Sequence, residues 1–258
     1  MKISVMILAF LSFVSVSVFA QTDNWLNTKS THLIVYYKNA PESFIRQLTE
    51  KAEGYYNSIA SDLGFIRYDF WLWDQRAKIY VYDDAGSYQI ASGQPVWSVG
   101  CAIAKQKMIY TFTGAAGFFD AVLPHELGHI IFREFVGFDN YAVPIWLDEG
   151  AASYNQKIKY ALSDKMVRES IATGDFIGIQ QLSGFNPQLM DGQQVGLFYM
   201  EAVSIIDFLI RRFGRENFAL FCQNLRDKKD LKTALAYVYS LGSIQELEQV
   251  WKNYLING

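Results

Sequence analysis

The 258-residue sequence predicts an α+β fold, with strands in its first part and helices in the rest. Segments with strand character end near residue 112, and from Phe118 onward the apolar residues are spaced almost wholly as in helices. Apolar side chains make up 51% of the chain, so a sizeable core can form. No linker, repeat or low-complexity tract interrupts the sequence, which favours one continuous folded unit.

The first element of the chain has the pattern of a secretory signal peptide. A positive charge at Lys2 precedes an almost purely apolar run over residues 3–19, and the small residue Ala20 follows that run before the chain turns polar. An uncleaved membrane anchor is the alternative, since the run is nearly long enough to span a bilayer. We expect residues 1–20 to be removed and residues 21–258 to form a single domain of a secreted or periplasmic protein.

The sheet is predicted from four segments with strand character. They cover residues 32–37, 77–82, 100–104 and 108–112, and a short polar turn joins the last two. Helical spacing of apolar residues between positions 41 and 63 predicts a helix after the first strand. We expect these elements to belong to a sheet-containing N-terminal lobe that ends at about residue 140.

A helical C-terminal lobe is predicted after that point. Its helices are expected after Pro144, over residues 199–213 and over residues 243–255. The most apolar later stretch, residues 203–210, is interrupted by Ser204 and Asp207, so it predicts an amphipathic core helix. We therefore expect a soluble mature protein without stable membrane insertion.

Composition constrains the partners and the redox chemistry of the protein. The chain carries 23 basic and 26 acidic residues and has no Lys/Arg-rich block, so it lacks the electrostatic footprint of a nucleic-acid-binding protein. Cys101 and Cys222 are its two cysteines. In an exported protein they could form a disulfide or remain two buried thiols, because pairing depends on their separation in space.

The strongest chemical signal is the segment HELGH at residues 125–129, an instance of the HExxH pattern in the helix expected from Phe118. Side chains four residues apart on a helix lie on the same face, so His125 and His129 can both reach one zinc ion. Glu126 lies beside that ion and can act as a base toward a zinc-bound water. Two core histidines are the alternative, but chance assembly of this pattern from three histidines is well under about 1%.

A catalytic zinc site uses three protein ligands, so a further donor is expected downstream. The segment WLDEGAASY at residues 146–154 offers Glu149, whose apolar and small neighbours would make an unpaired carboxylate costly. Gly128, within the first motif, needs a packing reason, since a mid-helix glycine costs roughly 1 kcal/mol relative to alanine.

The chain resembles the gluzincin metallopeptidases in its HELGH segment and in Glu149. The 19 residues 130–148 separate the two. The resemblance is to the peptidase MA-like group related to thermolysin and the zinc aminopeptidases, and it extends more loosely over residues 32–255. It implies that His125, His129 and Glu149 bind one zinc ion. It also implies a thermolysin-like catalytic architecture: a small, mostly antiparallel sheet over the metal-bearing helix, then a helical lobe, with substrate between them.

The same resemblance implies a tyrosine that donates a hydrogen bond to the oxyanion. Tyr199 is the candidate because it would open the helix over residues 199–213, and a core tyrosine is the alternative. Two features depart from the relatives. Ser153 stands where thermolysin-like enzymes place an acidic residue that orients a histidine, so the partner of His125 stays open. Residues 100–104 lack the carboxylate with which aminopeptidases hold a free amine, which favours internal cleavage.

These residues predict a zinc-dependent peptidase that hydrolyses peptides or proteins, an endopeptidase in preference to an exopeptidase. Glu126 would act as general base and then acid toward a zinc-activated water, and Tyr199 would share the oxyanion with the metal. Residues 100–104 could dock an extended peptide or form an ordinary buried hairpin. The alternatives are an inactive zinc-stabilised binding or surface protein with a protease fold, and a zinc hydrolase acting on other substrates. The cleavage preference and the oligomeric state are not specified by the sequence.

Overall fold

The structure, a computed structural model, describes residues 24–65, 71–156, 160–185 and 191–257, so the predicted signal peptide lies outside the described residues. Within them, one sheet has the strand order β1-β2-β3-β5-β4, which leaves β4 at an edge. The strands are β1 (Leu26–Lys29), β2 (Leu33–Tyr37), β3 (Ala77–Tyr82), β4 (Gly100–Ile103) and β5 (Met108–Phe112).

The sheet is mixed rather than mostly antiparallel. β1 pairs with β2 and β4 pairs with β5 in antiparallel fashion, whereas β2 with β3 and β3 with β5 are parallel. The parallel pairs follow from helical crossovers, because α1 (Glu42–Asp62) joins β2 to β3 and α2 (Ala85–Ser92) lies between β3 and the last two strands. The predicted α+β class is confirmed. β1 was not predicted, because its side chains are mostly exposed and show no apolar alternation.

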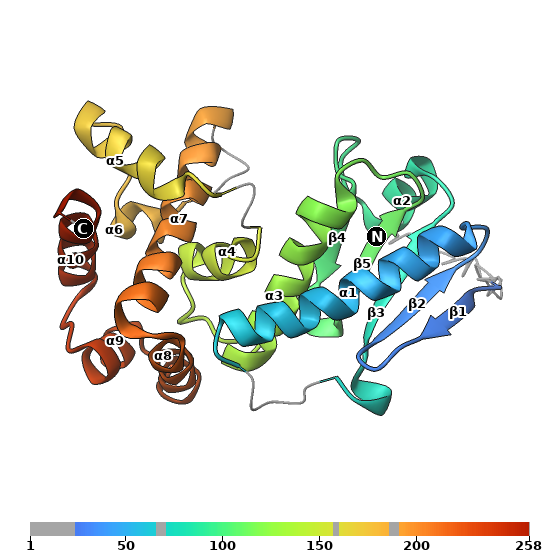
Figure 1. Ribbon diagram of the computed structural model, residues 1–258, viewed down its shortest axis with the longest axis horizontal. Coiled ribbons are helices and arrows are strands. Elements are labelled where there is room, and N and C mark those ends of the chain that lie inside the picture. Colours follow the sequence, from blue (N-terminus) through green and yellow to red (C-terminus); the bar gives the residue numbers. More distant parts are fainter. Residues whose placement is uncertain (1–23, 66–70, 157–159, 186–190, 258) are drawn as a thin grey trace, which may run out of the picture.

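One face of the sheet carries the core. In Figure 1, α1 and α3 (Leu123–Val136) lie together on this face. Alternate residues of β3 are fully buried, and α1 buries an apolar stripe at helical spacing. The buried residues of these two elements include Ala77, Ile79, Val81, Ile45, Leu48, Ala52 and Ile59. This packing places the HELGH helix next to the edge strand β4.

The rest of the chain is helical, as predicted. The helices are α4 (Ile145–Ser153), α5 (Ser163–Thr173), α6 (Ile179–Leu182), α7 (Gly192–Phe213), α8 (Arg215–Lys228), α9 (Leu231–Tyr239) and α10 (Ile244–Asn257). Short turns occur at η1 (Trp73–Gln75), η2 (Ala104–Gln106) and η3 (Phe118–Val122). Because η3 is a π-helical turn, the α-helix expected from Phe118 begins at Leu123. Figure 1 shows α4 between the sheet-bearing part and the other helices.

The helix that carries Tyr199 begins earlier than predicted. The carboxylate of Asp191 accepts hydrogen bonds from the backbone N–H groups of Gln193 and Gln194, each at 2.9 Å, so α7 starts at Gly192 and Tyr199 lies two turns inside it. The prediction that Tyr199 opens this helix is wrong, because the N-cap signal lies at the aspartate.

Among the described residues, α7 is the one helix long and apolar enough to cross a membrane by length and composition. Half of its most apolar stretch is buried inside the protein, and it packs against α4 and α5. Glu201 and Ser204 are fully buried on it. These contacts agree with the predicted core helix. The two cysteines, Cys101 on β4 and Cys222 on α8, are free thiols.

Candidate active site

The site begins with close contact between α3 and α4. A Cβ atom added to Gly128 would lie 2.7 Å from both the Cα and the O atoms of Ala152, so the two helix backbones touch. A Cβ on Gly150 would similarly lie 2.6 Å from the carbonyl O of Ala202 on α7. The packing reason expected for Gly128 is therefore present. These contacts hold α4 between α3 and α7 and turn Glu149 toward the histidine pair.

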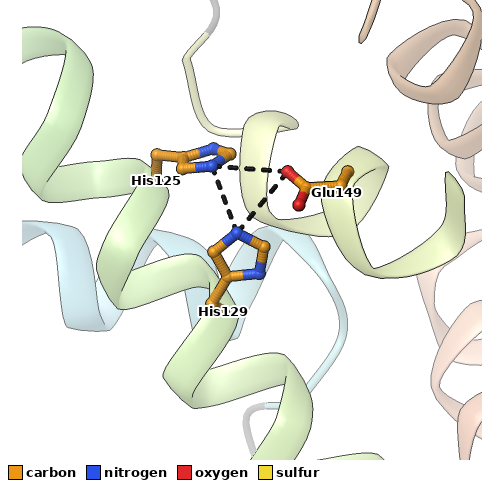
Figure 2. A group of neighbouring side chains, drawn as sticks. All are labelled: His125, His129 and Glu149. Carbon is orange, nitrogen blue, oxygen red and sulfur yellow. Dashed lines mark hydrogen bonds and ion pairs between the residues drawn. The ribbon is translucent and has the colours of Figure 1, made fainter. Parts of the chain in front are cut away.

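Figure 2 shows the imidazoles of His125 and His129, both from α3, facing the carboxylate of Glu149 from α4. The Nε2 atoms of the two histidines lie 3.1 Å apart. Glu149 Oε2 lies 3.5 Å from Nε2 of His125 and 3.6 Å from Nε2 of His129. The three residues that the sequence nominated as ligands thus form one partly buried cluster.

The dimensions of this cluster fit a tetrahedral metal ion. Zinc–nitrogen and zinc–oxygen bonds of about 2.0–2.1 Å in a tetrahedron imply ligand atoms about 3.3 Å apart, close to the distances observed. Glu149 Oε2 is buried and accepts no hydrogen bond from any described residue. A buried carboxylate oxygen without a donor is costly, and a cation would satisfy it. Two imidazoles and one carboxylate are also a ligand set that zinc prefers.

Both imidazoles are oriented by hydrogen bonds at their other nitrogen. Asp148 Oδ1 lies 3.1 Å from Nδ1 of His129, and Arg133 Nε donates to Asp148 Oδ2 at 2.7 Å. Ser153 Oγ lies 3.1 Å from Nδ1 of His125. These contacts direct each Nε2 toward the cluster centre. Ser153 is thus the hydrogen-bond partner of His125 that the sequence left open. Asp148 was not predicted as the partner of His129, although its place next to Glu149 on α4 could have indicated it.

The site is electrostatically prepared for a cation. Burial opposes the charged form of His129, but the carboxylates of Asp148 and Glu149 outweigh burial and raise the pKa of His129 well above its usual value. For Glu149 burial acts to raise the pKa, and the two histidines overcome it and lower the pKa. The Glu149 carboxylate is therefore held in its anionic form, the form that binds metal.

Glu126 lies beside the cluster and is not one of its members. Burial raises the pKa of Glu126 to about 7, while His129 and the backbone N–H of Ala102 on β4 act in the opposite direction. A divalent cation nearby would also favour the carboxylate. A carboxyl group poised near neutrality next to the metal cluster has the properties of a general base.

Tyr199 also reaches the site. Its ring centroid lies 6.2 Å from that of His125. Burial, followed by the charge of Glu149, raises the pKa of Tyr199 well above its usual value, so its phenol stays protonated. The side chain is thus a potential hydrogen-bond donor next to His125, and it also packs against the hydrophobic core.

Two cavities flank Glu126. One, of about 320 Å³, also borders His125 and Tyr199, and the other, of about 280 Å³, also borders His129 and Asp148. The edge strand β4 borders both cavities, because its first residue, Gly100, lines the first together with the preceding residues 98 and 99, and Cys101 and Ala102 line the second.

An HExxH helix joined by a glutamate from the following helix, beside an edge strand, defines a metallopeptidase-type centre. The chain belongs to the peptidase MA superfamily, whose family model matches residues 73–257. The matched range includes α3, α4 and α7 with every residue of the cluster. No curated protein matches the chain. Membership confirms the resemblance predicted from the two motifs and places the protein in a metallopeptidase superfamily, with peptides or proteins as the class of substrate.

Proposed function

We propose that the protein is a zinc-dependent endopeptidase that acts outside the cytoplasm. The proposal includes removal of residues 1–20 and a mature domain over residues 21–258, with a sheet-containing lobe to about residue 140 and a helical lobe after it. The observation that carries the proposal is the near-tetrahedral spacing of the ligand atoms of His125, His129 and Glu149.

One zinc ion would be held by these three residues, and when bound it supplies a Lewis acid that polarises a carbonyl group and lowers the pKa of water. Glu126 takes the proton of the attacking water on its carboxylate and delivers it to the leaving amine. Tyr199 donates its phenol hydrogen to the oxygen on which negative charge develops. Asp148 and Ser153 keep the two imidazoles in the orientation that ligation requires.

Internal cleavage is supported by the surroundings of Glu126. Glu126 lines two cavities, one bordered also by His125 and Tyr199 and the other by His129 and Asp148, which gives room for substrate residues in each. β4 is an edge strand whose residues are only partly buried, which suits addition of an extended peptide by main-chain hydrogen bonds. Two carboxylates line the second cavity. Asp148 is engaged by Arg133 and His129, and Glu126 serves the reaction, so neither offers a site for a free amine.

The test is hydrolysis of an unfolded protein and of a peptide library by the purified mature chain. Cleavage should disappear with a chelator and return with zinc, and mass spectrometry of the products should show internal cuts. Products that differ from the substrates only by loss of single terminal residues would contradict the endopeptidase assignment. Absence of cleavage by the fully zinc-loaded chain would support the inactive binding protein instead.

A further inference from the structure

We propose that Val96 and Trp97, at the tip of a turn beside the active site, bind a large apolar side chain of the substrate about two to four residues from the cleaved bond. This inference rests on the proposed peptidase function and names the class of substrate, an extended polypeptide with an apolar residue near the cut. Neither residue belongs to the two motifs found in the sequence.

The two side chains are large, apolar and almost fully exposed. Val96 is 82% exposed and Trp97 is 79% exposed. The backbone N–H of Ser98 donates to the carbonyl of Pro95 at 2.9 Å, which closes the turn and places Val96 and Trp97 at its two central positions. Such positions usually carry small or polar residues, so folding alone does not explain this pair. An exposed apolar cluster of this kind marks a binding surface.

The turn is held in place by the helix before it. The Ser98 hydroxyl lies 2.6 Å from the hydroxyl of Tyr88, which is fully buried on α2. The side-chain amide of Gln89, also on α2, donates to the carbonyl of Val96 at 3.4 Å. Because the turn is already ordered in the free protein, a ligand that binds there loses less free energy to ordering it.

The surroundings of the turn along the chain carry no charge. Residues 85–104, which run from α2 through the turn and β4 to the first residue of η2, contain no Asp, Glu, Lys, Arg or His. At the chain's average of 19% charged residues, about four of these 20 positions would carry a charge. This stretch offers no ion pair to a substrate, so burial of apolar surface is the attraction that it supplies.

Trp97 connects the turn to the active site. It lines the same cavity, of about 320 Å³, as Glu126 and His125. A substrate segment that fills this cavity therefore meets Trp97 close to the bond that is cleaved. Since an extended chain rises about 3.3 Å per residue, about two to four residues cover the way from Glu126 to Trp97.

The polar side chains of this cavity do not compete for the same role. Gln156 and Tyr160 are nearly fully buried, so neither presents much surface to a ligand. Gln156 donates to the backbone carbonyl of Ala121, and the ring of Tyr160 stacks with that of Tyr199. The other polar residues act in the proposed reaction or hold the turn, namely His125, Glu126 and Ser98. Trp97 is therefore the exposed group of the cavity that can select a substrate side chain.

Two other occupants fit this surface less well. An anionic membrane attracts Lys and Arg, which residues 85–104 lack, and it would repel Asp83 and Asp84 directly before them. A second copy of the chain needs roughly 800 Å² per partner for a stable interface, which two side chains cannot supply. A substrate that already occupies the neighbouring cavity gains affinity from a smaller added contact.

The test compares quenched fluorescent peptides with leucine or glutamine at each of the four positions on either side of the cleaved bond. At one position two to four residues from the cut, the wild-type kcat/KM should be about 10-fold to 50-fold higher for leucine. The double variant Val96→Gln/Trp97→Gln should reduce this ratio below about threefold and cleave the glutamine peptides at close to the wild-type rate. Trp73→Gln is the matched control, because Trp73 is 80% exposed on η1 and lines neither cavity.

Equal wild-type kcat/KM values for leucine and glutamine at all of these positions would overturn the inference. A leucine preference that survives in the folded double variant would do the same. If the double variant instead lost self-association in sedimentation velocity, or binding to phosphatidylcholine vesicles, with its leucine preference intact, the surface would belong to a second copy or to a membrane.

Failure of the peptidase function is seen separately, as absent cleavage of every peptide. In that case the readout is the Kd of each peptide for the zinc-loaded wild type, measured by calorimetry. Tighter binding of the leucine peptides, lost in Val96→Gln/Trp97→Gln and kept in Trp73→Gln, would support the apolar subsite in an inactive binding protein. Equal Kd values for leucine and glutamine peptides would refute it.

Discussion

Asp148 Oδ1 lies 3.1 Å from Nδ1 of His129, so the residue directly before one metal-ligand candidate orients another that is 19 residues earlier in the chain. The same carboxylate is bound by Arg133, whose Nη2 lies 2.7 Å from Asp148 Oδ2. Burial acts to raise the pKa of Asp148, but the charges of His129 and Arg133 lower it below its usual value. A permanently charged carboxylate behind the imidazole makes His129 a better metal ligand.

Asp148→Asn should therefore weaken zinc binding about 10-fold to 100-fold, because the amide can still hydrogen-bond the imidazole but no longer carries the charge. The measurement is the zinc Kd from competition with a chromophoric chelator. Asp139→Asn is the control, since Asp139 forms an exposed ion pair with Lys105 and its loss should leave the Kd unchanged. An Asp148→Asn variant with wild-type affinity would show that the contact does not tune the site.

Glu126→Gln should retain one zinc ion per chain and lose about 10²-fold to 10⁴-fold in kcat, because the amide cannot accept the proton of the attacking water. Metal content by atomic emission and turnover of an unfolded protein provide the two measurements. The exposed Glu50→Gln on α1 is the control for the substitution itself. Activity at the wild-type level in Glu126→Gln would refute the assignment of the general base.

Tyr199→Phe should lower kcat by about 10²-fold to 10³-fold with little change in KM, because the phenol would act on charge that develops only in the transition state. The comparison needs kcat and KM from initial rates on one peptide. The exposed Tyr141→Phe serves as the control. If kcat stays within a few-fold of wild type, Tyr199 is a packing residue of α7.

Gly128→Ala should destabilise the fold by about 1–3 kcal/mol, although alanine is the better helix former, because the new Cβ would overlap the Ala152 backbone at 2.7 Å. Gly54→Ala in α1 is the matched control. A Cβ there meets nothing within 4 Å, so this change should stabilise by about 0.5–1 kcal/mol. Urea unfolding in the presence of a chelator measures both, and equal effects of the two changes would contradict the close helix contact.

Glu201 should make stability depend on pH. It is fully buried on α7, and burial raises its pKa to about 7, although its carboxylate accepts hydrogen bonds from the backbone N–H groups of Ile177 and Gly178 at 2.9 and 3.1 Å. The folded state then retains a proton that the unfolded state releases above about pH 4.5. The contribution of protonated Glu201 to the free energy of unfolding is therefore fully present below that pH. It falls by up to about 3 kcal/mol as the pH rises to about 7.

Glu201→Gln removes this titration. The free energy of unfolding of the wild type minus that of Glu201→Gln, measured in urea without metal at several pH values, should decline between pH 4.5 and 7. A difference that stays constant over this range would mean that the pKa of Glu201 is not raised by folding.

Much of the site was predictable because its geometry is local. The four-residue spacing of His125 and His129 determines by itself that both side chains share a helix face, whatever the helix packs against. The strands at 77–82 and 108–112 have their predicted bounds because the residues alternate between buried and partly exposed positions along each. The predicted start of α7 at residue 199 was too late, because Asp191 caps the helix about two turns before the apolar stripe that begins at Tyr199.

The sequence alone thus determined the α+β class, the spacing of the two histidines on α3, the carboxylate of Glu126 beside them and, through the second motif, the superfamily. The tertiary structure decided the parallel central pairs of the sheet, the partners of the two imidazoles at Asp148 and Ser153, and the two cavities that Glu126 lines. The reason is physical. Helix and strand periodicity sets directions over a few residues, whereas contacts between α3, α4 and β4 depend on how closely whole elements pack, and at Gly128 that distance is set by the absence of one methyl group.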